Sequence, residues 1–267
     1  MTLGRAWLLI GAVVAMPAHA ADRAEAIDRS TLRVCADPAA PPSSTEDGSG
    51  YENRIAALLG RDLGVPVAYT WFPTGIGFYR RTLSARRCDV VIGTVVGLDN
   101  AQTTIPYYRS AFVLVTRAAD LAASADLADP KLGIVGVQSG SPAADVLARA
   151  GRLDSSRAYT LTADGGATAV GARMVADVAA KRIDAAVLWG PIGGHFAALQ
   201  PGVFRVTPLA SGSAPSPLAF EIGMAVRYGE AQWHARLDRF IRDNRAALQA
   251  ILVAAHVPLL PLTETTP

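Results

Sequence analysis

The sequence predicts an α/β protein of two lobes, with parallel-type sheets, a hinge and an interlobe cleft. Two observations predict it. Short apolar runs rich in β-branched residues alternate with helices of about ten residues, an order typical of parallel strands joined by right-handed crossovers. This pattern starts again after a polar connector at 118–130, and the chain then returns to the first unit. Two connections between lobes would act as a hinge, so a cleft that opens and closes on a guest is expected.

The first 20 residues have the features of a secretory signal peptide. Arg5 precedes an apolar run over 6–15, and Ala18-His19-Ala20 forms a small-x-small cleavage site. The run of about ten residues is shorter than the roughly 20 that a membrane-spanning helix needs. Cleavage after Ala20 therefore predicts a periplasmic protein, with an uncleaved anchor as the alternative.

Composition excludes several classes of partner. The chain of 267 residues has 25 Lys and Arg against 23 Asp and Glu, and one basic residue would leave with the signal. A mature chain so close to neutrality has no long-range field to attract nucleic acid or an acidic membrane surface. We expect a monomer without a nucleic-acid partner.

The first lobe is predicted to comprise residues 21–117 together with 216–267. Its helix at 51–63 has apolar residues at helical spacing and closes at Gly64. The other elements expected there are strands at 31–36, 65–71, 88–93, 111–116 and 220–226, and helices at 77–86 and 233–253.

The second lobe is predicted to comprise residues 118–215. A strand at 132–137 leads to Ser141 and Pro142, which suit the capping residue and the first position of a helix. A helix at 167–182 has one apolar face, and a buried strand at 183–188 is broken at Trp189-Gly190-Pro191.

The state of the two cysteines is left open by the sequence. Cys35 and Cys88 both lie in the mature chain, and an exported pair is oxidised by default. If neighbouring strands place Cys35 level with Ile92, however, Cys88 lies four residues lower, roughly 13 Å away at the usual strand rise. That separation exceeds disulfide reach.

Ligands of open α/β sheets bind at the carboxyl ends of the strands. The residues expected to line the cleft are Asp37, Trp71, Thr94, Val95, Gln138, Ser139, Ser141, Trp189 and Gly190. The helix start at Ser141 could hold an anion with its N–H groups, or Ser141 could serve only as a cap. A set of aromatic residues forms either a wall for an apolar guest or ordinary core: Trp71, Phe78, Tyr107, Tyr108 and Trp189.

No catalytic, metal or cofactor motif is recognisable. His195, His234 and His256 lack the spacing of metal ligands, and there is no nucleophile elbow, phosphate loop or dinucleotide fingerprint. Glu52 and His195 could form an acid/base pair across the cleft, although Glu52 also suits a first-turn helix acid. We therefore expect no catalytic residue, cofactor or metal.

Two sets of segments resemble known proteins. Four of them, 32–37, 136–141, 182–187 and 222–227, resemble the type II periplasmic solute-binding proteins of family 3, the polar amino-acid class, over nearly all of the mature chain. Six others resemble the J-type branch, encoded beside PQQ-dependent alcohol (methanol) dehydrogenases: 33–38, 51–56, 68–71, 87–91, 106–110 and 189–191.

The departures from the family bear on the ligand. Amino-acid binders carry an Arg for the ligand carboxylate where this chain has Ala101, and an Asp for the ligand ammonium where it has Trp189. Without them a bound zwitterion would keep unpaired charges, at a cost of several kcal/mol. The chain also leaves the J-type pattern in the loop at 39–44 and at 138–141.

The resemblance implies a non-enzymatic protein associated with a PQQ-dependent dehydrogenase, acting as an accessory or binding partner. One alternative is a receptor that delivers a small non-zwitterionic solute to an inner-membrane ABC permease. Another is a dehydratase-like enzyme on the same fold.

Overall fold

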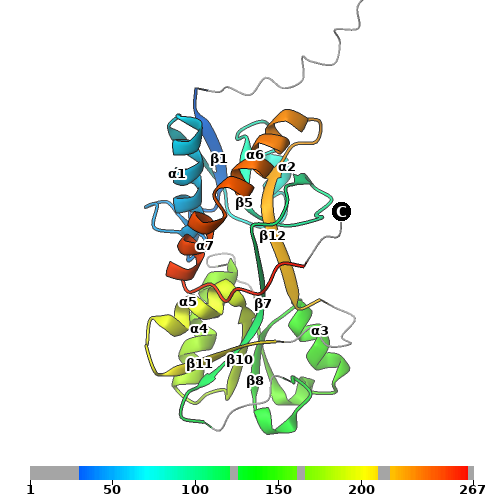
Figure 1. Ribbon diagram of the computed structural model, residues 1–267. Helices are drawn as coiled ribbons and strands as arrows, with labels where there is room; N and C mark the ends of the chain where they lie inside the picture. Colours follow the sequence, from blue (N-terminus) through cyan, green and yellow to red (C-terminus); the bar gives the residue numbers. More distant parts are fainter. Residues whose placement is uncertain (1–29, 121–125, 161–165, 210–216, 264–267) are drawn as a thin grey trace, which may run out of the picture.

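The computed structural model describes residues 30–120, 126–160, 166–209 and 217–263. The predicted signal peptide lies outside these residues. Figure 1 shows two lobes, one above the other, joined by the long strands β7 (Tyr108–Arg117) and β12 (Ala219–Val226). The predicted two-lobed α/β architecture is confirmed.

Three parallel strands form one side of the upper lobe's sheet. β1 (Leu32–Ala36) lies between β4 (Val67–Trp71) and β5 (Val90–Val95). The apolar side chains of β1 and those of β5 up to Ile92 are almost fully buried, as expected of strands covered on both faces, whereas the edge strand β4 is only partly buried. β12 then joins the sheet antiparallel to β5, and β7 lies antiparallel to β12. The upper sheet is therefore mixed, with its parallel part at β4, β1 and β5.

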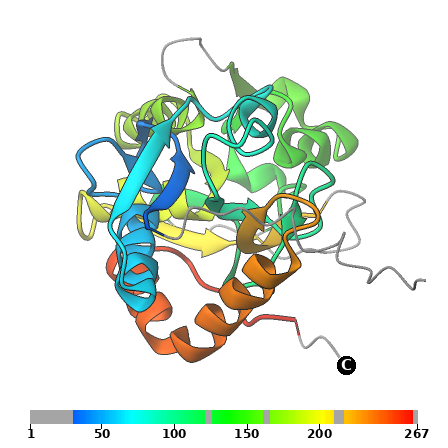
Figure 2. The same ribbon diagram turned by 90° about the horizontal axis from the view of Figure 1, so that it is seen from above.

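Helix α1 (Tyr51–Leu63) ends as predicted at Gly64, whose φ of 70° is the left-handed conformation that glycine adopts without a steric penalty. It lies beside α7 (Arg245–Ala254), and α7 follows α6 (Ala231–Asp243). Seen from above, the three helices lie along one side of the upper sheet (Figure 2). Their apolar faces complete the core cluster around β1 and β12.

Two predicted helices differ from the structure. The helix expected at 77–86 is only α2 (Phe78–Arg81), because Thr82 leaves helical geometry and its hydroxyl donates to the carbonyl of Phe78. The long helix expected at 233–253 is divided between α6 and α7 at Asn244, whose side-chain amide donates back to the carbonyl of Phe240. A side chain that satisfies a helical carbonyl competes with continuation of the helix.

The lower lobe has a second run of parallel strands, in the order β10, β8, β9, with β7 antiparallel to β10. Strands β9 (Ser156–Tyr159) and β11 (Phe204–Pro208) were not predicted from the sequence. The elements of this lobe are β8 (Val135–Gln138), α3 (Pro142–Arg149), β9 (Ser156–Tyr159), α4 (Gly166–Ala179), β10 (Ala185–Trp189), α5 (Gly190–Ala198) and β11 (Phe204–Pro208). Two apolar clusters pack on opposite faces of this sheet.

β7 belongs to both lobes. Its first part pairs with β12 as far as Ala111, and from Phe112 onwards it pairs with β10. The change of partner at Ala111 and Phe112 marks where the strand passes between lobes (Figure 1). The lobe boundaries expected at residues 117 and 215 stay a prediction.

Cys35 and Cys88 form a disulfide with Cα atoms 5.4 Å apart. The register argument against this bond was wrong for two reasons. Cys35 is level with Val91 instead of Ile92. In addition, β5 begins only at Val90, and the chain bends at Asp89, between Cys88 and the strand. Cys88 is therefore not displaced along the strand axis as an extended chain would require.

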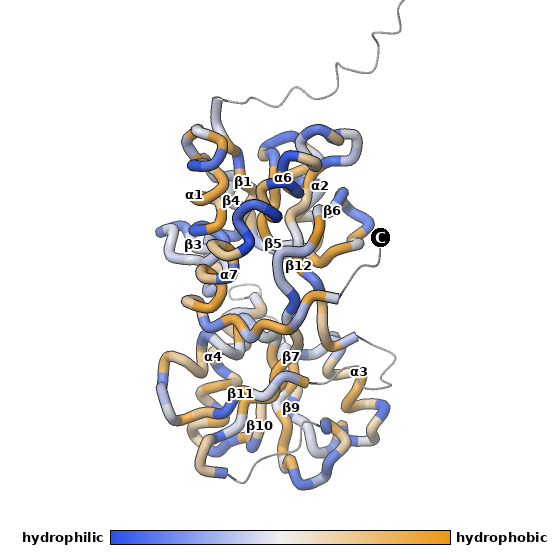
Figure 3. The backbone as a smooth tube through the Cα atoms, viewed as in Figure 1, coloured by the Kyte–Doolittle hydropathy of each residue, from blue (hydrophilic) through white to orange (hydrophobic). Residues whose placement is uncertain are grey.

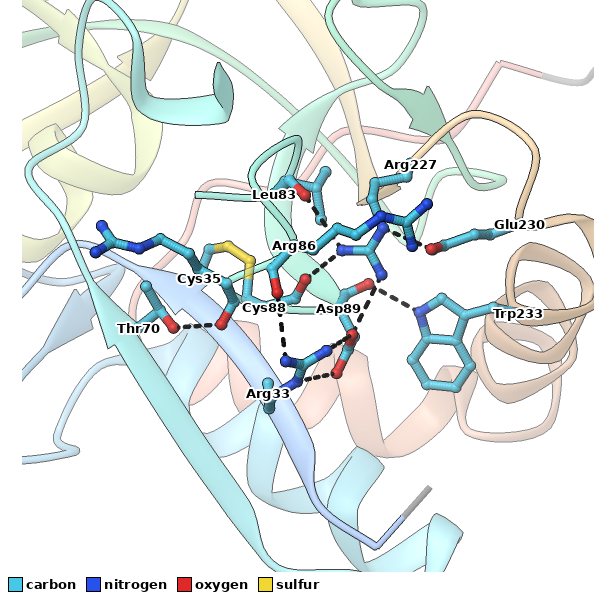
Figure 4. Close-up of polar contacts among 11 residues, drawn as sticks. Arg33, Cys35, Thr70, Leu83, Arg86, Cys88, Asp89, Arg227, Glu230 and Trp233 are labelled. Carbon is cyan, nitrogen blue, oxygen red and sulfur yellow. Dashed lines mark hydrogen bonds and ion pairs between the residues drawn. A yellow bond between two sulfur atoms is a disulfide. The ribbon is translucent and has the colours of Figure 1, made fainter. Parts of the chain in front are cut away.

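A buried charge network lies next to this disulfide (Figure 4). The carboxylate of Asp89 accepts from Arg33 at 2.6 and 2.8 Å and from Arg227 at 3.2 Å, while its side chain is 1% exposed. Arg227 also pairs with Glu230 at 2.5 Å, and Trp233 Nε1 donates to the carbonyl of Asp89 at 2.9 Å. These contacts connect β1, the entry to β5, the end of β12 and α6.

Hydropathy follows the layers of the fold. In Figure 3 hydrophobic colour concentrates on the strands between the helices, and much of α6 is hydrophilic. Among the described residues, no helix combines the length and apolar character needed to cross a membrane.

A candidate ligand site at the strand ends

The upper-lobe residues of the predicted site share one edge of the sheet. Asp37 directly follows β1, Trp71 is the last residue of β4 and pairs in register with Ala36, and Thr94 lies near the end of β5. The carboxylate of Asp37 accepts backbone N–H groups from Ala39 at 2.9 Å and Thr74 at 2.6 Å. Asp37 therefore fixes the two loops of this edge, and each of its carboxylate oxygens accepts one backbone hydrogen bond.

The remaining upper-lobe candidates differ in exposure. Trp71 is half-buried and stacks on Tyr69, with ring centroids 4.5 Å apart and an interplanar angle of 9°. Thr94 is buried and shares a 2.8 Å hydrogen bond with the hydroxyl of Tyr79. Val95, by contrast, is 39% exposed. Trp71 and Val95 are thus the more accessible groups of this edge.

The lower-lobe candidates follow β8 and β10, whose parallel pairing brings their carboxyl ends to one edge. Gln138 ends β8, and Ser139 after it is exposed. Ser141 is buried and its hydroxyl accepts the N–H of Ala144 at 3.3 Å, so it caps α3 as predicted. Anion binding at this helix start stays a prediction.

Trp189 ends β10 and packs at the connection between the lobes. Its ring makes edge contacts with Phe112 of β7 and Phe220 of β12, at centroid distances of 5.8 and 5.9 Å. The next residue, Gly190, has no room for a side chain, because a Cβ atom there would meet Ala111 and Ser110 of β7. This strand end therefore packs directly on the hinge strands.

The predicted aromatic wall is only partly present. Phe78, Tyr107 and Tyr108 are each less than 10% exposed and pack in the upper core. Trp71 and Trp189 keep partial exposure. Ordinary core packing therefore accounts for three of the five residues.

Glu52 was considered from the sequence only as an acid/base partner of His195 and was not among the residues predicted to line this edge. It lies in the first turn of α1, but its carboxylate points to the backbone of Gly93 in β5, where a Cβ atom would collide with it. Burial, and secondarily the charge of Asp37, raise the pKa of Glu52 to about 7. Its charge in turn contributes to raised pKa values at Tyr69, Tyr79 and Tyr107. A glycine inside an apolar strand was the available signal, since it often marks close approach of another group.

Glu52 and His195 do not form the proposed acid/base pair in this structure. The charge that acts on Glu52 is that of Asp37, and the charge that acts on His195 is that of His256. No hydrogen bond or ion pair joins Glu52 to His195 in the described part of the chain. Nor does that part contain a cluster of three His, Cys, Asp or Glu residues that could hold a metal ion.

Ala101 occupies a different environment from that of a ligand-binding residue. It is 3% exposed and belongs to the apolar cluster around the disulfide, with Phe78, Leu83 and Val91. Its methyl group thus contributes to the core and offers nothing to a ligand carboxylate.

Comparisons with known proteins agree with this geometry. No family model matches the sequence. The chain is 32% identical over 253 residues to protein MoxJ of Methylorubrum extorquens, covering 89% of this chain and 84% of MoxJ. It is similar to the crystal structure of the periplasmic binding protein XoxJ from Methylobacterium extorquens AM1, with a TM-score of 0.72 and 36% identity over 86% of this chain and 100% of XoxJ. MxaJ from Methlophaga aminisulfidivorans MPT shares the fold, with a TM-score of 0.75 at 19% identity over 86% of this chain and 100% of MxaJ.

Two lobes joined by antiparallel hinge strands, with candidate residues at the strand ends, define a type II periplasmic binding protein. The chain belongs to the MoxJ family. It is a periplasmic-binding-like protein of a methanol oxidation system, as the resemblance in the sequence predicted.

Proposed function

We propose that this protein is a non-catalytic accessory protein that associates with a PQQ-dependent alcohol (methanol) dehydrogenase. The observation that carries the proposal is the loss of both charged groups that would hold an amino acid. Ala101 is buried in the core, and Trp189 packs between Phe112 and Phe220. The scaffold of an amino-acid binder is thus retained without its ligand anchors.

The energetic consequence for a zwitterionic ligand is large. Its carboxylate would lack a bidentate guanidinium partner, and its ammonium would lack the usual lower-lobe carboxylate. Asp37 does not stand in for that carboxylate by position, because it follows β1 in the upper lobe, where each of its oxygens accepts one backbone hydrogen bond. Removing two charges from water without partners costs several kcal/mol, which would weaken binding at least a thousandfold.

The compartment fits this role. The disulfide between Cys35 and Cys88 suits the oxidising periplasm, where the relatives are found. We further propose that residues 1–20 are a signal peptide removed after Ala20, which N-terminal sequencing of the exported protein would test.

A binding experiment with the cognate dehydrogenase tests the proposal. The mature protein and the purified enzyme are mixed at tens of micromolar and examined by size-exclusion chromatography with light scattering and by chemical crosslinking. We expect a complex heavier than the dehydrogenase alone. A family 3 amino-acid binder of similar size is the control. Co-elution of that control, or absence of any complex, would contradict the proposal.

A second candidate is a transport receptor for a small non-zwitterionic solute, which would require an inner-membrane permease as partner. The half-buried stack of Trp71 on Tyr69 at the upper strand edge favours it, because an aromatic face suits a planar or cationic guest. A thermal-shift screen discriminates the two functions, since a ligand at 100 times its Kd adds about 2.7 kcal/mol to the free energy of unfolding.

A dehydratase-like activity has one supporting feature. The pKa of Glu52, raised to about 7, lies where a general acid or base works best. If any turnover were found, Glu52→Gln and His195→Ala would have to reduce it. Unchanged turnover in both variants would exclude these residues from catalysis.

A further inference from the structure

A second pocket lies where the two lobes meet, and none of the nine predicted ligand residues lines it. Its volume is about 250 Å³. The upper lobe supplies Pro41, Pro42 and Arg54, together with His256 after α7, and the lower lobe supplies His195 and Leu199 at α5. The pocket therefore exists only while the two lobes keep this arrangement.

Three basic side chains face this pocket without a protein partner. Arg54, His195 and His256 make no side-chain hydrogen bond or ion pair with any described residue. No Asp or Glu occurs among the residues that line the pocket. A hollow lined by charge of one sign concentrates counter-ions, so this arrangement favours the binding of an anion.

The charge of His256 acts on the ring of His195. Burial, followed by the charge of His256, lowers the pKa of His195. Among the described residues, no acidic side chain counteracts this lowering of the His195 pKa. Helix α5 packs against α4, β7, β10 and β11, and none of their charged side chains forms a hydrogen bond or ion pair with the ring of His195. These side chains are Arg173 and Asp177 of α4, Arg109 and Arg117 of β7, and Arg205 of β11.

The backbone fixes His256 in this position. Its φ of 57° is the left-handed conformation, and its carbonyl oxygen lies against Gly194 of α5, where a Cβ atom would collide with it. The next turn of chain is held by Ser110, whose hydroxyl donates to the carbonyl of Pro258 at 2.6 Å. The imidazole of His256 is thus placed at the pocket by main-chain contacts, while its ring nitrogens stay available.

We propose that this pocket binds a small oxyanion, a carboxylate or a phosphate, between Arg54 and the protonated rings of His195 and His256. Charge-assisted hydrogen bonds from a guanidinium and two imidazolium groups suit the oxygens of such an anion. The anion would hold groups from both lobes and oppose their separation. This site is independent of the strand-end residues and of the proposed dehydrogenase partner.

Titration of the histidine Hε1 protons by NMR tests the proposal, with inorganic phosphate or acetate as the probe at constant ionic strength. We expect either anion, or both, to raise the pKa of His195 and His256 by at least about half a unit. His234 is the internal control, because its Nε2 lies 2.9 Å from the carbonyl oxygen of Thr103, away from the pocket. His195→Gln and His256→Gln assign the resonances.

The affinity of the pocket for the anion should fall as His195 and His256 lose their protons. A histidine with the reference pKa of about 6.5 loses about tenfold of its protonated population between pH 5.5 and 7.5, and one with a lowered pKa, such as His195, loses more, so binding should weaken at least tenfold over that range. Arg54→Gln should weaken binding about tenfold, whereas Arg61→Gln, in the last turn of the same helix and outside the pocket lining, should not. The proposal would be overturned if a 20-fold excess of the anion over millimolar protein left the pKa values of His195 and His256 unchanged. It would also be overturned if the anion raised the pKa of His234 by the same amount.

Discussion

The carboxylate of Glu52 in α1 lies against the backbone of Gly93 in β5, in a space that any larger residue at position 93 would fill. Burial there and the nearby charge of Asp37 raise the pKa of Glu52 to about 7. One glycine thus allows an ionisable group to reach the predicted ligand edge.

Replacing Gly93 tests this relationship. Gly93→Ala should turn the Glu52 carboxyl away, because the atom that it displaces is the far end of a flexible side chain. We expect a loss of less than about 1.5 kcal/mol in the free energy of unfolding. The pKa of Glu52, followed by carboxyl ¹³C chemical shifts, should fall toward its usual value of 4.5. An unchanged pKa near 7 would show that Gly93 does not determine the environment of Glu52.

The raised pKa of Glu52 also predicts a pH dependence of stability. Between pH 4.5 and 7 the folded protein keeps a proton that the unfolded chain has lost, so this group's contribution to stability falls as pH rises. Glu52→Gln removes the effect. At pH 8 the variant should exceed the wild-type free energy of unfolding by about 2 kcal/mol, allowing for partial solvent screening.

Urea unfolding at several pH values measures this difference. At pH 4.5 the carboxyl group is almost fully protonated in the folded protein and about half protonated in the unfolded chain, so this titration separates the variant from the wild type by only about 0.4 kcal/mol there. A constant difference between pH 4.5 and 8 would mean that Glu52 titrates with an ordinary pKa.

The sequence predicted the helices and strands that are specified by patterns within a few neighbouring residues. Strand β1, helix α1 with its glycine end, and the cap at Ser141 all follow from apolar period or from one residue's conformational preference. The interruption at Asn244 was missed because a single side-chain hydrogen bond outweighs a continuous apolar stripe.

Long-range geometry was harder to predict. The antiparallel pairing of β12 and β7 depends on how the chain returns between lobes, which no local pattern records. The disulfide was left open because a straight extrapolation of β5 back to Cys88 ignored the bend at Asp89. At the candidate site, the strand-end positions of Asp37 and Trp71 could be predicted, but the raised pKa of Glu52 depends on packing between distant segments.

The Asp89 network predicts a large loss on removal of its one shared acid. Asp89→Asn leaves Arg33 and Arg227 without their buried countercharge and should lower the free energy of unfolding by about 3–5 kcal/mol. Asp62→Asn is the matched control, because its pair with Arg236 is more exposed and should cost about 1 kcal/mol or less. Equal losses in the two variants, measured by urea unfolding, would show that burial does not strengthen the Asp89 contacts.

The disulfide between Cys35 and Cys88 closes a loop across 53 positions of sequence, so it should stabilise the protein mainly by restricting the unfolded chain. Replacing both cysteines with Ala should lower the free energy of unfolding by about 2–5 kcal/mol, a range typical of such loops. A reductant should destabilise the wild type and leave the double variant unchanged, which separates loss of the bond from loss of packing around two nearly inaccessible side chains.

Because Cys88 directly precedes Asp89, the disulfide also positions the acid that Arg33 and Arg227 share. We therefore expect the losses in the cysteine variant and in Asp89→Asn to be less than additive when the two are combined.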